Sequence, residues 1–144
     1  MKSAPRKPTS TPREQGYRMP AEWEPHEATW LAWPHERTDW PGKFAPIPWV
    51  YADIVRHLAR VERVRILVAS RAEQEQARRI LKKNGAELAA VDFFIVPTNR
   101  GWTRDYGPIF IKKREATGPG GIALGISLPG RMTRAWNAAA LPSR

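Results

Sequence analysis

The chain is 144 residues long, carries a formal net charge of +10 and contains no cysteine. That length is enough for one domain with a hydrophobic core. The lack of cysteine excludes disulfides, a thiolate metal site and a cysteine nucleophile from this chain. No apolar run reaches the length of a membrane span, and the N-terminus shows no signal-peptide core. We therefore expect no membrane partner and a cytoplasmic location.

The positive charge is concentrated at the two ends of the chain. Residues 1–18 carry a net charge of +4, residues 112–144 carry +5, and residues 19–111 carry only +1. A dedicated nucleic-acid binder more often places its basic residues on the folded part of the chain. This distribution makes nucleic acid an unlikely class of partner.

The first part of the chain predicts a tail, an irregular approach and a strand. Residues 1–15 are rich in Lys, Pro, Ser and Thr without apolar periodicity, which is typical of a disordered basic tail. The aromatic residues and prolines of 16–25 predict an ordered but irregular segment. A strand is expected at 28–33, followed by a long loop over 34–48. Loops of that length inside a compact domain are often functional. This one contains His35, Asp39, Trp40, Pro41 and Gly42.

A first amphipathic helix is predicted from Pro48, a residue type favoured in the first helical turn. The inward face is expected to consist of apolar residues spaced by four, with two neighbours widening it. These residues are Val50, Ile54 and Leu58, with Tyr51 and Val55.

A second helix is predicted to begin after Ser70, because Ser70 and Glu73 have the spacing of a capping box. Asn84 and Gly85 are expected to end it. Its inward residues are expected to be Ala77, Ile80 and Leu81.

The remaining strands are expected at 64–69, 91–96 and 109–111. Strands alternating with helices predict an α/β fold with a mainly buried sheet. Residues 115–144 are expected to be irregular, because Gly118-Pro119-Gly120-Gly121 is a cluster of chain breakers and only the run at 122–128 resembles an element.

The segment 99–108, between the last two predicted strands, combines an indole, a carboxylate and basic residues with two glycines. A carboxylate beside an aromatic residue on such a loop suits the binding of a cationic ligand. The same residue types also fit a closed turn held by an Arg104–Asp105 ion pair. The residues alone leave both interpretations open.

Other chemistry finds little support in the sequence. His26 and His35 lie nine positions apart across a predicted strand, which does not fit a metal site, and His57 is expected to be structural. No glycine-rich loop has the residues or the context of a phosphate-binding motif. We therefore expect neither a metal nor another cofactor.

Two separate motifs resemble one enzyme family. GYRMPAEWEPH at 16–26, followed by TWLAWP at 29–34, is similar to the N-terminal signature of the agmatine deiminases, a family that includes the Porphyromonas-type peptidyl-arginine deiminases. WTRDYGP at 102–108 resembles the W-x-R-D-x-G-P motif of that family. The resemblance covers residues 16–113, which we interpret as the N-terminal part of a deiminase domain (16–114). Two motifs in the correct order are more specific than either alone.

The resemblance implies a pentein fold, a five-bladed α/β propeller, of which this chain would hold the first module and the start of the second. It also implies hydrolysis of a guanidinium group, with agmatine or an arginine side chain as substrate, and a link to putrescine synthesis. By the resemblance, Asp105 binds the substrate guanidinium and Trp102 lines the pocket over the cation. Arg104 and Gly107 shape the loop.

The chain also departs from the family pattern. The nucleophilic cysteine and the acid–base histidine that the resemblance implies belong to later modules, and this chain contains no cysteine. We interpret the segment from about Gly125 onward as the result of truncation or of a frameshift, and we expect this chain alone to be inactive. The alternatives are a cation-binding module without catalysis, or a module that assembles with a complementing chain or with copies of itself. A basic nucleic-acid binder is a weaker alternative.

Overall fold

The structure is a computed structural model that describes residues 10–25, 27–107, 109–113 and 122–125. Most of the predicted tail and of the segment 115–144 lies outside these residues. The run predicted to resemble an element does contain a strand, at Ile122–Gly125. No helix among the described residues is long and apolar enough to cross a membrane.

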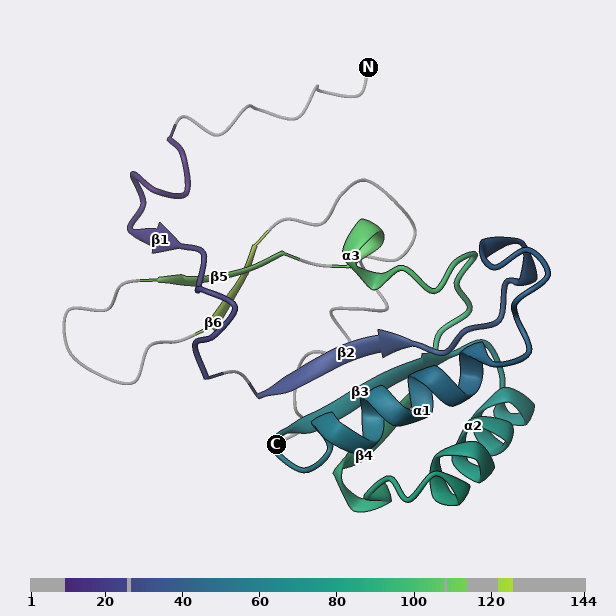
Figure 1. Cartoon of the computed structure of the whole chain (residues 1–144). Coiled ribbons are helices and arrows are strands. Elements are labelled where there is room, and N and C mark those ends of the chain that lie inside the picture. The colour runs from purple at the N-terminus through teal and green to yellow at the C-terminus, as the bar shows by residue number, and fades with distance from the viewer. Residues whose placement is uncertain (1–9, 26, 108, 114–121, 126–144) are drawn as a thin grey trace.

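A three-stranded parallel sheet has two helices on one of its faces (Figure 1). Strands β2 (Ala28–Ala32), β3 (Arg63–Val68) and β4 (Val91–Ile95) lie in this order. Helix α1 (Ile47–Leu58) connects β2 to β3, and α2 (Arg71–Lys83) connects β3 to β4. Right-handed crossovers between parallel neighbours place both helices on the same side. The predicted α/β order is confirmed.

The main core lies between this sheet and the two helices. Val64, Ile66 and Val68 alternate along β3 and are buried under the helices, together with Ala77 and Leu81 of α2. The side chains of α2 thus face inward as predicted, with Ile80 partly buried against the same cluster. Burial of the four larger aliphatic side chains, those of Val64, Ile66, Val68 and Leu81, contributes roughly 1.5–3 kcal/mol each.

The predicted inward face of α1 is partly wrong. Val50 and Ile54 are 51% and 42% exposed, whereas Val55 is fully buried as predicted, and so is Ala52, which the prediction did not include. A small alanine side chain lets a helix approach a sheet closely, so the face of α1 that carries Ala52 packs on β3. The larger Val50 and Ile54 then lie at the side of the helix and stay partly exposed. Leu58 is partly buried against the core, as predicted.

The start of α2 shows the predicted cap with one difference. The Ser70 hydroxyl accepts a hydrogen bond from the Glu73 N–H at 3.2 Å. The Glu73 carboxylate accepts from the N–H of Ala69, rather than from that of Ser70. At the other end Gly85 has φ of 75°, a conformation that glycine adopts at little cost.

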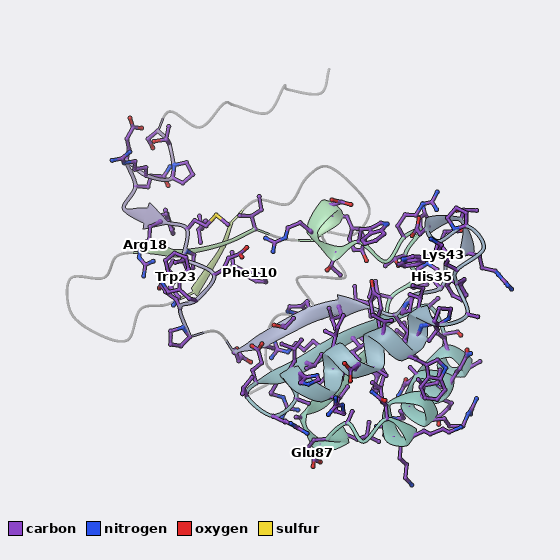
Figure 2. The ribbon with its side chains drawn as sticks, viewed as in Figure 1. Arg18, Trp23, His35, Lys43, Glu87 and Phe110 are labelled. Atoms are coloured by element: carbon purple, nitrogen blue, oxygen red, sulfur yellow. The ribbon has the colours of Figure 1, made fainter. Side chains whose placement is uncertain are left out.

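A second, antiparallel sheet forms from segments far apart in the sequence. β5 (Ile109–Lys113) pairs with β1 (Tyr17–Arg18) on one side and with β6 (Ile122–Gly125) on the other. Arg18 donates two hydrogen bonds to the Glu24 carboxylate, at 2.6 and 2.8 Å, and so closes the turn after β1. Figure 2 labels Arg18 and Trp23 in this part of the molecule. The ordered but irregular segment predicted at 16–25 therefore contains a short strand, β1, that pairs with β5.

This ion pair predicts a response to acid. Hydrogen bonds from Arg18, and then from the Ala21 N–H, lower the pKa of Glu24 to about 2. Because the pKa is lower in the folded chain, the contribution to stability is complete above the unfolded pKa of about 4.3 and is lost as the pH falls toward 2. We expect the Ala21 amide resonance to shift over this range as the turn opens. The Glu24→Gln variant should lack the acid transition and Glu22→Gln should keep it; a transition that survives in Glu24→Gln would contradict the assignment.

The opposite face of the parallel sheet carries a smaller apolar cluster. Ala32 and Leu67 are buried there, and Trp30 lies against Phe94 with ring centroids 5.0 Å apart. Tyr106, from the segment between β4 and β5, packs on the same cluster. This contact brings the described part of the loop, residues 99–107, onto the sheet.

Candidate functional site

The loops at the carboxyl ends of the parallel strands lie together at one edge of the sheet. They are the loop after β2, which holds the 3-10 helix η1 (Arg37–Asp39), and the loop after β4, which leads to the short helix α3 (Thr103–Tyr106). The carboxyl edge of a parallel sheet is the usual place for a ligand in such folds. In Figure 1, α3 lies on the side of the sheet opposite α1 and α2.

Helix α3 positions the residues that the sequence singled out. The hydroxyl of Thr103 donates to the Trp30 carbonyl at 3.4 Å, and Tyr106 packs on the sheet. The N–H of Gly107 donates to the Thr103 carbonyl at 2.7 Å and closes the turn. Gly107 has φ of −73°, so its backbone conformation is open to other residues.

Trp102 and Asp105 both face outward at this place. Trp102 is 44% exposed and Asp105 is exposed. The backbone N–H of Asp105 donates to the Trp102 carbonyl at 3.1 Å, which ties the two residues together. Within the described part of the chain, the Asp105 carboxylate has no hydrogen bond or ion pair. Its two oxygens are therefore accessible to a cationic ligand.

An aromatic cluster supports Trp102 from behind. The rings of Trp102 and Trp40 lie 5.3 Å apart, and Trp40 contacts Tyr51 edge-on at 6.4 Å. Phe44 completes the cluster at 6.0 Å from Trp40. An indole held in this way keeps one orientation, which a cation–π contact needs.

The alternative of an Arg104–Asp105 ion pair is not seen among the described residues. Arg104 instead pairs with Glu22 at 3.1 Å, and both side chains are largely exposed. An exposed pair of this kind contributes little to stability. The Arg104 guanidinium, which would otherwise compete with a ligand for Asp105, is thus paired with Glu22 in the segment before β2.

The ion pair that does hold the loop joins Arg100 to Asp39, at 2.9 Å. The side chain of Asp39 is only 9% exposed, and its second oxygen, Oδ2, is buried without a partner among the described groups. Arg100 also donates to the Thr38 hydroxyl at 2.7 Å. Burial, and then the charge of Asp39, raise the pKa of the neighbouring Tyr51. Breaking such a partly buried pair leaves a carboxylate uncompensated, which is costly.

His35 joins the same two loops through their backbones. Its Nδ1 lies 3.0 Å from the carbonyl oxygen of Trp33, and its Nε2 lies 2.8 Å from that of Thr98. Figure 2 labels His35, with Lys43, at this edge of the sheet. The sequence predicts a functional loop at 34–48 but predicts no particular role for His35 within it. The only signal was its unusual content of polar and aromatic residues.

No group of three candidate metal ligands converges in the described part of the chain, which includes His35 and His57. His57 binds the Asp53 carbonyl of its own helix at 2.8 Å, in line with the structural role expected for it. His26 lies outside the described residues.

Comparison with known proteins identifies the class. A family model described as Porphyromonas-type peptidyl-arginine deiminase matches residues 18–128. The agmatine deiminase of Pseudomonas aeruginosa (strain LESB58) is 38% identical over 104 residues, which cover 72% of this chain and 27% of that protein. The agmatine deiminase of Medicago truncatula is 33% identical over 108 residues, which cover 75% of this chain and 27% of that protein.

A solved structure agrees with these matches. The agmatine deiminase of C. jejuni superposes with a TM-score of 0.55 at 26% identity, over 66% of this chain and 27% of that one. These matches place the α/β fold in the deiminase class. The chain belongs to the family of agmatine deiminases and Porphyromonas-type peptidyl-arginine deiminases. It spans 27% of the length of the first of these relatives.

Proposed function

We propose that this chain supplies the guanidinium-binding half of a deiminase site, with Asp105 and Trp102 as the binding residues. The observation that supports this most directly is the pairing of an accessible carboxylate with an indole held by Trp40. A carboxylate accepts two parallel N–H bonds from a planar guanidinium, and this geometry fixes both position and direction. The indole face stabilises the same cation by roughly 0.5–2 kcal/mol.

The parent reaction that fits this family is hydrolysis of the guanidinium of agmatine, which gives N-carbamoylputrescine and ammonia and leads toward putrescine. Peptidyl-arginine, which would give citrulline, is the second candidate substrate. In either case Asp105 orients the guanidinium carbon for attack, which is the positioning part of catalysis. Arg104 and Gly107 shape the loop: the Gly107 N–H closes the turn on the Thr103 carbonyl, and the pair with Glu22 keeps Arg104 from opposing a cationic substrate.

The bond-making step needs groups that are absent from this sequence, which has no cysteine. We propose that the described fold is the first module and the start of the second of a pentein propeller, and that the remaining modules supply the nucleophile and the acid–base histidine. On this proposal the chain alone binds a guanidinium without hydrolysing it. A complementing chain, or further copies of this one, would be needed to form a closed propeller.

Calorimetry with agmatine, paired with an ammonia-release assay on the same purified chain, tests the proposal. We expect heat of binding and no ammonia above the rate without protein. Ammonia release would contradict the predicted lack of activity. The absence of binding heat at millimolar agmatine would contradict the guanidinium site.

A further inference from the structure

The His35 ring faces two hydrogen-bond acceptors, whereas a neutral imidazole has only one N–H to donate. Both ring nitrogens face backbone carbonyl oxygens, Nδ1 that of Trp33 at 3.0 Å and Nε2 that of Thr98 at 2.8 Å. A neutral imidazole has one N–H donor and one nitrogen lone pair, whereas the imidazolium has two donors. A carbonyl oxygen has no hydrogen to donate. Only the charged form therefore makes both hydrogen bonds in this geometry.

The two carbonyls belong to the two loops that form the site. Trp33 directly follows β2, and Thr98 lies between β4 and α3. The Thr98 hydroxyl in turn donates to the carbonyl of Arg100 at 3.0 Å, two residues before Trp102. His35 thus holds the backbone that leads to Trp102 and Asp105.

Two charged residues, one from each loop, bear on the charge of this part of the site. On its own segment, Glu36 accepts hydrogen bonds from Thr38, and these, followed by the charges of Arg100 and His35, lower the pKa of Glu36. On the opposite loop, Arg100 is occupied by Asp39. Glu36 is close enough to His35 for the two charges to interact, which is compatible with a charged imidazole.

We propose that His35 is a positioning residue that acts as an imidazolium: its two N–H groups tie the loop after β2 to the loop after β4 and hold Trp102 and Asp105 in place. Loss of the proton places a nitrogen lone pair against a carbonyl oxygen. Because the ring is rigid, a rotation that relieves one of these contacts also moves the other nitrogen. The loop then loosens. For ligand binding, the inference rests on the guanidinium site proposed above.

The first test needs no ligand. Histidine is the side chain that changes charge between about pH 5 and 8. We expect the hydrogen-exchange protection factors of the Asp105 and Gly107 amides to fall about tenfold between pH 6 and 8.5, the effect of losing one charge-assisted hydrogen bond. The His35→Gln variant should show a low, constant protection over that range. The matched control His57→Gln, altered on the surface of α1, should follow the wild-type chain.

Protection in His35→Gln that falls with pH as in the wild-type chain would overturn the proposal, as would constant protection in the wild-type chain. If His35→Gln does not fold, the ring ¹⁵N resonances of the wild-type chain decide. They should show N–H on both nitrogens of His35 at about pH 6. A lone pair on either nitrogen, with the loop still protected, would refute the role of the imidazolium.

The second test uses agmatine as the probe. The dissociation constant should rise about tenfold over the same pH range in the wild-type chain and in His57→Gln, and stay nearly constant in His35→Gln. A wild-type dissociation constant that does not change with pH would overturn the coupling of His35 to the site. If agmatine does not bind at all, the guanidinium site is refuted, and the exchange data still decide whether His35 holds the loop.

Discussion

Replacing Asp105 by alanine is expected to weaken agmatine binding about 30- to 100-fold, which corresponds to about 2–3 kcal/mol. The variant removes both oxygens that accept N–H bonds from the guanidinium. It should leave the fold intact, because Asp105 is exposed and its side chain bonds to no other described residue. Calorimetry measures the change, and thermal unfolding verifies that the melting temperature is unaltered.

A matched control separates this effect from a general change in charge. Asp53→Ala removes an exposed aspartate of the same chain, one that pairs with Arg56 on α1 at 2.7 Å. Asp53 lies on α1, outside the two loops that form the site. The dissociation constant of agmatine for this variant should therefore stay within about twofold of the wild-type value, since distant sites are usually independent. Equal affinities for the wild-type chain and Asp105→Ala would remove Asp105 from the site.

Replacing Val55 by alanine is expected to lower the free energy of unfolding by about 1–2.5 kcal/mol. The side chain is fully buried, and loss of its two methyl groups leaves a small cavity under α1. The better helix propensity of alanine offsets roughly 0.5 kcal/mol of the loss. Urea denaturation measures the change as a lower midpoint with an unaltered slope.

Val50→Ala is the matched control, because it makes the same substitution on the same helix. Because Val50 is 51% exposed, the free energy of unfolding of this variant should differ from the wild-type value by less than about 0.5 kcal/mol, or rise slightly through the better helix propensity of alanine. Equal losses in the two variants would contradict the observed orientation of α1, in which Val55 is buried and Val50 is exposed.

The sequence predicts those features of the fold that depend on local pattern. The order of strands and helices follows from apolar runs and breakers, and Ser70 with Glu73 marks the start of α2 correctly. The orientation of α1 does not follow from pattern alone. Its residues are apolar on more than half of the circumference, so the approach of Ala52 to the sheet decides which side is buried.

The loop with Trp102 and Asp105 could also be predicted, but what holds it could not. Arg100 and Asp39 are separated by 61 positions, and His35 and Thr98 by 63. Such contacts arise only after parallel pairing brings the carboxyl ends of β2 and β4 to one edge. The pairing of β1 with β5 is of the same kind. Local periodicity contains no signal for contacts of this range.

The most direct test of the guanidinium site is an NMR titration that follows the indole N–H of Trp102 and the amide of Asp105. We expect both to shift with agmatine and with methylguanidinium, and neither to shift with 1,4-diaminobutane, which has the amines but no guanidinium. The Trp102→Phe variant assigns the indole signal among those of the seven tryptophans. Shifts of the same size with 1,4-diaminobutane, or shifts confined to other parts of the chain, would contradict a site built on Trp102 and Asp105.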